Sequence, residues 1–275
     1  MASSGWRCTW ATYHAELSEA SRRRQELEAL LHRALQEERL EVYFQPQIDL
    51  KTSNVIAREA LMRWQLQDGT FIPPGEFIPV AESTGLIKPL GEYLMRVIAR
   101  HAREAHEAGD TSSRFAINVS FAQFIDPEFV NKLIDALDKE KVSRNRFEIE
   151  LTETVLASDV SRSETIVREL DEAGFSIAID DFGSGYSSLS YLKNFPFDRL
   201  KIDKSFIFGL PADQNSAVIV RASIGLGHEL GLKVLAEGVE TAEQRDLLVE
   251  LGCDEAQGYY FGKPAPFDVN AISPR

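Results

Sequence analysis

Short β-rich runs alternate with amphipathic helical patterns through most of the chain after Leu40. Within these runs apolar side chains recur at every second position, the period of a strand with one buried face. The runs cover residues 42–50, 55–64, 115–120, 147–153, 176–182, 199–207, 233–239 and 255–262. About eight strands with intervening helices predict a (β/α)8 TIM-like barrel, and a doubly wound open sheet is the alternative.

Helical periodicity separates most of these runs. The segments with a helical pattern are 86–108, 127–140, 164–173, 216–230 and 242–251. Glycine follows several of them, at Gly109, Gly174, Gly231 and Gly252, where a helix commonly ends.

The region before Leu40 has a different pattern. Residues 15–39 contain no Gly or Pro and place Leu27, Leu31 and Ala34 on one helical stripe, which predicts a long amphipathic helix. This helix either packs on its own domain or is a connector that transmits signals or pairs with a second copy of the chain. The expected domains are an N-terminal remnant with this linker helix (1–40), the barrel (41–268) and a C-terminal tail (269–275).

Net charge, the lengths of apolar runs and the cysteine count argue against several classes of protein. The 275 residues include 30 Lys and Arg against 43 Asp and Glu, a formal net charge of −13, which argues against a DNA partner because such proteins need a cationic face. No run approaches the roughly 18 apolar residues of a membrane span, and the first residues lack a signal pattern, so we expect a cytoplasmic protein. With only Cys8 and Cys253, redox chemistry is not expected.

Polar side chains share one face of four predicted strands. Asn118, Glu150, Asp180 and Lys201 each lie opposite the apolar positions of their own strand. In a barrel this face points inward, so these side chains would converge near the carboxyl ends of neighbouring strands, where barrel active sites lie. Three further residues near strand ends could join them: Glu59, Glu237 and Gln257.

Convergence of so many carboxylates points to a bound cation. Any single acid of this set is more simply a solvated strand end or part of an ion pair, but several together repel one another. Carboxylate and amide oxygens select Mg²⁺ or Mn²⁺ over Zn²⁺. Adjacent Asp180 and Asp181 would allow a carboxylate to bridge two ions, an arrangement suited to displacement at phosphorus, so a phosphodiester is the expected substrate.

A glycine-rich segment follows these aspartates. Residues 182–192 read FGSGYSSLSYL, with Gly183 and Gly185 permitting a sharp turn. A simple turn between strand and helix would also explain the glycines. The position directly after Asp181 favours a mobile loop that positions a metal ligand.

Taken together, these motifs resemble the EAL domain, the bacterial cyclic di-GMP phosphodiesterase. The naming motif is Glu59-Ala60-Leu61, and the resemblance covers about residues 40–266. The further motifs, in chain order, are NVS from Asn118, ELTE at 150–153, DDFGSGYSSL at 180–189, KID at 201–203, AEGVE at 236–240 and QGYYFGKP at 257–264.

The resemblance implies a barrel with one antiparallel strand and assigns roles to individual residues. Glu237 is the candidate general base, Lys201 orients water or stabilises charge in the transition state, and Glu153 anchors the glycine loop. The implied metal ligands, for two ions of Mg²⁺ or Mn²⁺, are Glu59, Asn118, Glu150, Asp180 and Asp181. The implied substrate-binding residues are Gln45, Leu61, Arg63, Asp203 and Gln257.

The implied reaction is hydrolysis of cyclic di-GMP to linear pGpG by metal-activated water. The resemblance also implies a homodimer and an upstream sensory or cyclase domain. Two alternatives remain open at this point. A catalytically silent cyclic di-GMP receptor would bind without turnover, and a barrel glycosidase using Glu150 and Glu237 would leave Asn118, Asp180 and Lys201 unexplained.

Overall fold

The computed structural model describes residues 5–183 and 194–269, with side chains described from residue 21 onward. It divides into two compact units, one formed by residues 1–41 and 63–90 and the other by residues 42–62 and 91–275. Within the described residues, no helix combines the length and apolarity needed to cross a bilayer.

Eight strands close into a barrel, most of which belongs to the second unit. The strand order around the ring is β1, β9, β8, β7, β6, β5, β4 and β2, and pairing of β1 with β2 closes it. The barrel predicted from sequence is therefore confirmed, and the open-sheet alternative is wrong. The bounds are β1 Leu40–Asp49, β2 Val55–Gln65, β4 Arg114–Asn118, β5 Phe147–Thr152, β6 Ser176–Phe182, β7 Arg199–Ile202, β8 Lys233–Ala236 and β9 Glu255–Gln257.

One strand of the barrel is reversed. β1 pairs with β9 in antiparallel register, with Gln47 opposite Gln257, whereas β2 and β4 through β9 pair with their neighbours in parallel. A two-residue strand, β10 (Ala265–Pro266), pairs in antiparallel register with Tyr43 and Phe44 near the start of β1. The reversed strand implied by the family resemblance is thus present, and it is the first one.

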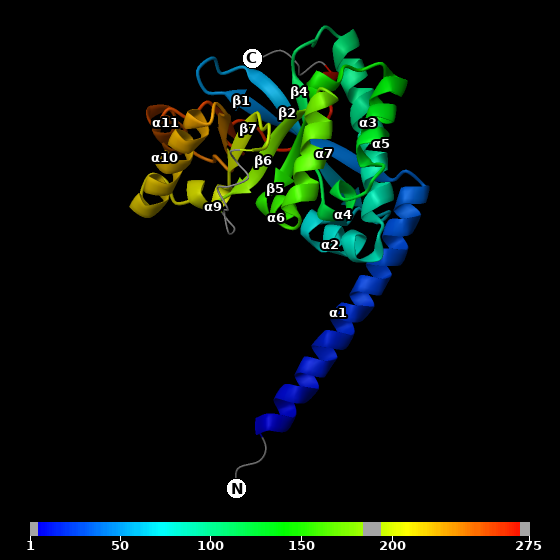
Figure 1. The fold of residues 1–275 in the computed structure, drawn as a ribbon. Coiled ribbons are helices and arrows are strands. Elements are labelled where there is room, and N and C mark those ends of the chain that lie inside the picture. The colour runs from blue at the N-terminus through cyan, green and yellow to red at the C-terminus, as the bar shows by residue number, and fades with distance from the viewer. Residues whose placement is uncertain (1–4, 184–193, 270–275) are drawn as a thin grey trace. The chain divides into compact units, whose positions relative to one another are not determined.

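Helices cover the outside of the barrel strands, as Figure 1 shows for α7 beside β5 and β6. Apolar strand residues that face these helices are fully buried, including Phe147, Ile177 and Leu200. The helices and turns after the first strands are α3 Ile87–Glu107, α4 Phe121–Phe124, α5 Phe129–Glu140, η1 Arg144–Arg146, α6 Glu153–Ala157, α7 Val160–Glu172, α9 Lys204–Ile207, α10 Gln214–Glu229 and α11 Ala242–Glu250.

Three predicted strands were clearly too long, and one of them, the run 233–239, ends as a strand at Ala236. The run 199–207 leaves the sheet after Ile202, because the Asp203 carboxylate accepts the N–H of Ser205 and caps the short helix α9. The run 255–262 ends as a strand at Gln257. The backbone of Gly258 lies so close to that of Val239 that a Cβ atom there would clash, which requires glycine at this turn.

The first unit contains α1 Gly5–Gln36, which begins ten residues earlier than the sequence pattern indicated, with β3 Phe71–Ile72 and α2 Pro74–Thr84. Leu27 and Leu31 of α1 are buried, as the apolar stripe predicted. Trp64 packs edge to face on Phe77 of α2 at a centroid distance of 5.6 Å. Helix α2 was not predicted, because Pro79 in its interior interrupts the expected pattern.

Candidate active site

Acidic side chains and one lysine meet inside the barrel near the carboxyl ends of the parallel strands. Strand alternation brings them there, since Asn118 on β4 pairs in register with Glu150 on β5, and Thr152 pairs with Asp180 on β6. We call this group the mouth layer, and its members are Glu59, Asn118, Glu150, Asp180, Asp181, Lys201, Glu237 and Gln257.

Lys201 lies at the centre of the mouth layer and is fully buried. Its Nζ atom is 2.9 Å from Oε2 of Glu150, 2.9 Å from Oδ1 of Asp180 and 2.8 Å from Oε1 of Glu237. Burial alone would lower the pKa of Lys201, but Asp180, Glu150 and Glu237 raise that pKa well above its usual range. The buried ammonium is therefore charged and joins three carboxylates that come from three strand ends.

Glu59 is held at both carboxylate oxygens. Its Oε1 accepts a hydrogen bond from Nδ2 of Asn118, and its Oε2 accepts one from Nε2 of Gln257, each at 2.5 Å. Two amide donors thus orient the acid of the Glu-Ala-Leu motif toward the centre of the layer.

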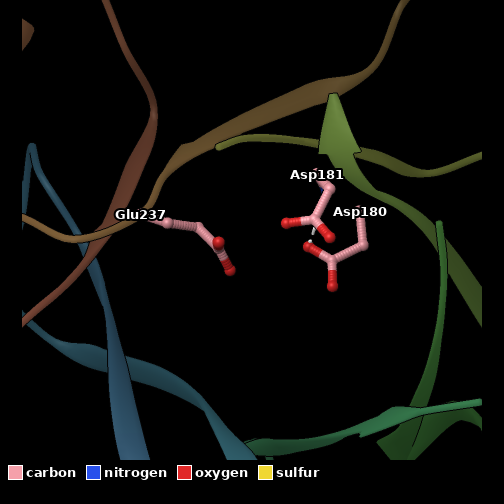
Figure 2. A group of neighbouring side chains, drawn as sticks. All are labelled: Asp180, Asp181 and Glu237. Atoms are coloured by element: carbon pink, nitrogen blue, oxygen red, sulfur yellow. Dashed lines mark hydrogen bonds between the residues drawn. The ribbon is translucent and has the colours of Figure 1, made fainter. Parts of the chain in front are cut away.

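Asp180 and Asp181 are adjacent, yet both carboxylates face the same space. Successive strand residues normally point to opposite faces. Asp181 adopts a left-handed backbone conformation, with φ of 54°, and the register between β6 and β7 shifts at this point. Figure 2 shows the result, with Glu237 pointing toward both aspartates from the other side. Ligand oxygens of these three residues lie within 4.8 Å of one another.

The electrostatics of the mouth layer indicate an excess of negative charge. Burial, together with Asp180 and Glu59, raises the pKa of Glu237 to about 8 in spite of the opposing effect of Lys201. Burial and the neighbouring Asp180 and Asp203 raise the pKa of Asp181 to about 6. Like charges that cannot all ionise in a desolvated space are stabilised by a cation.

The residues present fit a metal ion. Among the described residues, the mouth layer holds five carboxylates against the single ammonium of Lys201, and the remaining polar groups are the amides of Asn118 and Gln257. Such an oxygen-rich donor set suits hard divalent cations. The cluster of Asp180, Asp181 and Glu237 could therefore hold a metal ion.

Of two other residues predicted from sequence, Asp203 contacts the mouth layer and Glu153 contacts the segment that follows Asp181. Asp203 forms a side-chain hydrogen bond with Asp181. Burial raises the pKa of Asp203, but the hydroxyl and N–H of Ser205, and then this bond with Asp181, bring that pKa below its usual value. The carboxylate of Glu153 accepts the backbone N–H of Gly183 at 3.2 Å, and Glu153 itself is buried. Glu153 thus holds the start of the glycine-rich segment, while residues 184–193, on which the loop prediction falls, lie outside the described residues.

The other three residues predicted to bind substrate, Gln45, Leu61 and Arg63, do not belong to the mouth layer. Gln45 is buried, and its amide bonds Gln257 and the carbonyl of Gly262. Leu61 is half-buried on β2, and Arg63 belongs to the first compact unit. The roles of these three residues toward a substrate stay predictions.

A second charged group lies deeper in the barrel and was not selected from the sequence as a site. Arg199 is 2.5 Å from Oε1 of Glu148 and 2.8 Å from Oε2 of Glu255, and all three side chains are buried. We call these three residues the inner layer. Each stands two positions before a mouth-layer residue on the same strand, so the period of two could have found them.

The match to a known family covers most of the chain. The EAL domain model matches residues 28–264. Signaling protein YkoW of Bacillus subtilis is 43% identical over 239 residues, which cover 87% of this chain and 30% of that protein. The bifunctional diguanylate cyclase/cyclic di-GMP phosphodiesterase MucR of Pseudomonas aeruginosa is 39% identical over 236 residues, 86% of this chain and 34% of MucR.

A solved structure agrees with these matches. The PaMucR phosphodiesterase in complex with c-di-GMP superposes with a TM-score of 0.85 at 38% identity, covering 88% of this chain and 98% of that one. The chain spans about a third of the length of the two curated relatives. These matches cover most of the chain, and its barrel carries the expected acids at the open end. The chain therefore belongs to the EAL domain family.

Proposed function

We propose that this chain hydrolyses cyclic di-GMP to linear pGpG. The observation that carries the proposal is the mouth layer, in which a buried lysine joins three carboxylates at the open end of an EAL barrel. The relative MucR is named a cyclic di-GMP phosphodiesterase, and the solved PaMucR structure is a complex with c-di-GMP. Both support this choice of substrate. Every residue type that the family resemblance requires is present among the described residues of the layer.

The metal site would be built from oxygen ligands. Glu59, Asn118, Glu150, Asp180 and Asp181 would hold Mg²⁺ or Mn²⁺, with room in this donor set for two ions. When bound, such cations neutralise the charge of a phosphodiester and lower the pKa of the attacking water. The excess of carboxylates over cations in the mouth layer supports this assignment.

Glu237 would act as the general base. Its carboxylate lies opposite Asp180 and Asp181, half-buried at the end of β8, and therefore faces the space where the reacting phosphate would sit. Lys201, 2.8 Å from Glu237, would keep that carboxylate oriented and offset the negative charge that builds on phosphorus.

The proposed step is an in-line displacement at phosphorus. The water oxygen forms a bond to phosphorus, and the P–O3′ bond breaks in line with it. One proton of the water passes to Glu237, which later releases it to solvent, and a solvent water supplies the proton with which the departing 3′ oxygen becomes a hydroxyl. The product is the linear dinucleotide with a 5′ phosphate.

Substrate contacts would come from around the open end of the barrel. We propose that Gln45 and Gln257 meet the dinucleotide from β1 and β9, that Arg63 binds phosphate, and that Leu61 and Asp203 complete the surface. A homodimer, an upstream sensory or cyclase domain and a cytoplasmic location are also proposals, and relatives about three times longer than this chain support the idea of an attached domain.

The test is incubation of the purified chain with cyclic di-GMP and Mn²⁺ or Mg²⁺, with and without EDTA, following pGpG by chromatography. We expect pGpG only when free metal is present. Cyclic di-GMP that binds but stays intact would instead identify a silent receptor. Turnover that persists in EDTA after dialysis would contradict the metal site.

A further inference from the structure

Three buried glutamines connect the inner layer to the mouth layer. Gln47 on β1 stands directly opposite Gln257 on β9 in the antiparallel register, and Gln45 lies two residues from Gln47 on the same face. Their side chains are all buried, with exposed fractions of 7%, 0% and 4% for Gln45, Gln47 and Gln257. We call these three residues the glutamine relay.

The hydrogen bonds of the relay run in one direction. Arg199 donates from its NH1 group to Oε1 of Gln47 at 2.9 Å, and Nε2 of Gln47 donates to Oε1 of Gln257 at 3.0 Å. Nε2 of Gln257 donates both to Oε2 of Glu59 and to Oε1 of Gln45. Finally, Nε2 of Gln45 donates to the carbonyl of Gly262 at 3.0 Å.

The two ends of the relay determine this direction. A guanidinium has only donors, so Arg199 requires the oxygen of the Gln47 amide to face it. A carboxylate and a carbonyl have only acceptors, so Glu59 and Gly262 require N–H groups to face them. A glutamine amide presents an oxygen on one side and an NH₂ group on the other, so each residue passes the orientation on to the next.

We propose that Gln47 is a positioning residue for the metal site. Arg199 fixes the orientation of the Gln47 amide, and Gln47 in turn fixes the orientation of the Gln257 amide. This keeps the NH₂ group of Gln257 hydrogen-bonded to Glu59. The proposal rests on the proposed role of Glu59 as a metal ligand. Hydrogen-bond partners of this kind orient ligands and commonly change metal affinity by about 10-fold to 100-fold.

Loss of Gln47 would leave the amide of Gln257 without its fixed donor. A rotated Gln257 amide would present its oxygen to the Glu59 carboxylate, and the two acceptors would repel each other. Glu59 would then keep only the hydrogen bond from Asn118.

The test measures binding of Mn²⁺ alone, by electron paramagnetic resonance of the free aquo ion, in the full chain. Gln47→Met removes the hydrogen bonds to Arg199 and Gln257, and also a longer one, at 3.5 Å, from Nε2 of Gln47 to Oε1 of Glu150. The side chain keeps a similar size, and we expect the Kd for Mn²⁺ to rise about 10-fold. Gln257→Met should give a similar or larger rise. The double variant should bind Mn²⁺ only slightly more weakly than Gln257→Met, because Gln47 acts chiefly through Gln257 and its direct bond to Glu150 is long.

A matched control separates this role from general stability. Gln244 is also a buried glutamine, but it donates to the carbonyls of Ile207 and Phe208 outside the relay. Gln244→Met should lower the Tm without changing the Kd for Mn²⁺. If Gln47→Met does not fold, Gln47→Asn, which withdraws the same amide by one methylene, should show the same rise in Kd.

Either of two results would overturn the proposal. The folded Gln47 variant could bind Mn²⁺ as the native chain does, or the effects of Gln47→Met and Gln257→Met could multiply in the double variant. Native chain that binds no Mn²⁺ would overturn the metal site as well as the relay, whereas a normal native Kd with an unchanged variant Kd would overturn the relay alone.

Discussion

The Nζ atom of Lys201 lies 2.8 Å from Oε1 of Glu237, at the point where strands β7 and β8 end side by side. A fully buried ammonium thus contacts the carboxylate that we propose as the base. The same ammonium also contacts Glu150 and Asp180. Removing the charge of Lys201 should therefore lower kcat more than it weakens the binding of Mn²⁺.

Lys201→Met should lower kcat by about 10²-fold to 10³-fold, because a preorganised positive charge near the phosphate would be lost. Mn²⁺ should still bind, since the carboxylates remain. Single-turnover kinetics at saturating Mn²⁺ and circular dichroism would check this. Lys233→Met, which removes an exposed lysine paired with Asp254, is the control and should keep native turnover. A Lys201 variant with more than a tenth of native kcat would contradict the assignment.

Asp181→Asn should weaken Mn²⁺ binding by about 10-fold or more while leaving thermal stability close to native, because Asn tolerates the left-handed backbone at this position. Asp181→Ala should show the same loss of affinity and should also lose about 1 kcal/mol of stability, since Ala does not tolerate that conformation. Mn²⁺ titrations and urea melts of both variants would separate the two effects. Native Mn²⁺ affinity in the Asn variant would exclude Asp181 as a ligand.

Glu153→Met should reduce turnover by about 10-fold, because the N–H of Gly183 loses its acceptor and the chain after Asp181 loses its anchor. Glu153→Gln keeps an oxygen acceptor and should stay within a few-fold of the native rate. The comparison of kcat for the two variants is the measurement. Equal losses in both would show that the charge of Glu153, and not its hydrogen bond to Gly183, is what turnover needs.

Asp110→Asn should lower the free energy of unfolding by about 3 kcal/mol at pH 7, because it leaves Arg58 and Arg146 buried without their carboxylate partner. Burial raises the pKa of Asp110, but the N–H groups of Ser113 and Ser112 and the Arg58 guanidinium bring it below the usual 3.8.

The sign of the pH effect follows from that lowered pKa. The stability that ionised Asp110 contributes is complete above its unfolded pKa and is lost as the pH falls below about 4. Urea melts from pH 7 to pH 3 should therefore show the native and Asn proteins converging. Glu164→Gln, in an exposed pair with Arg168, should change stability by less than about 0.5 kcal/mol. If the difference in unfolding free energy between the native and Asp110→Asn proteins stayed constant with pH, this assignment would be contradicted.

Much of the barrel could be predicted because its strands have a period of two. Asn118, Glu150, Asp180 and Lys201 were assigned to one inward face from alternation alone, and all four lie in the mouth layer. The helix 242–251 was also predicted almost to the residue, since Gly252 marks its end. These features depend on local patterns, which a sequence displays directly.

Other features depend on tertiary contacts and could not be predicted in the same way. Alternation places Asp181 on the face opposite Asp180, and only the left-handed backbone turns it inward. Arg199 and Glu148 carry no motif of their own, and their pairing across the barrel requires the closed ring of strands. The proposed role of Gln47 depends on its partners Arg199 on β7 and Gln257 on β9, which are far from it in sequence.

The reversal of β1 also decides where the chain enters the barrel. Because Gln47 pairs with Gln257 and Asp49 with Glu255, the earlier residues of β1 lie beyond the carboxyl end of β9. The polypeptide therefore arrives at the catalytic end, and five residues, about 17 Å of extended chain, separate Leu40 from Gln45. The backbone of β1 thus meets the neighbours of Glu59 at the catalytic end before it has crossed the barrel.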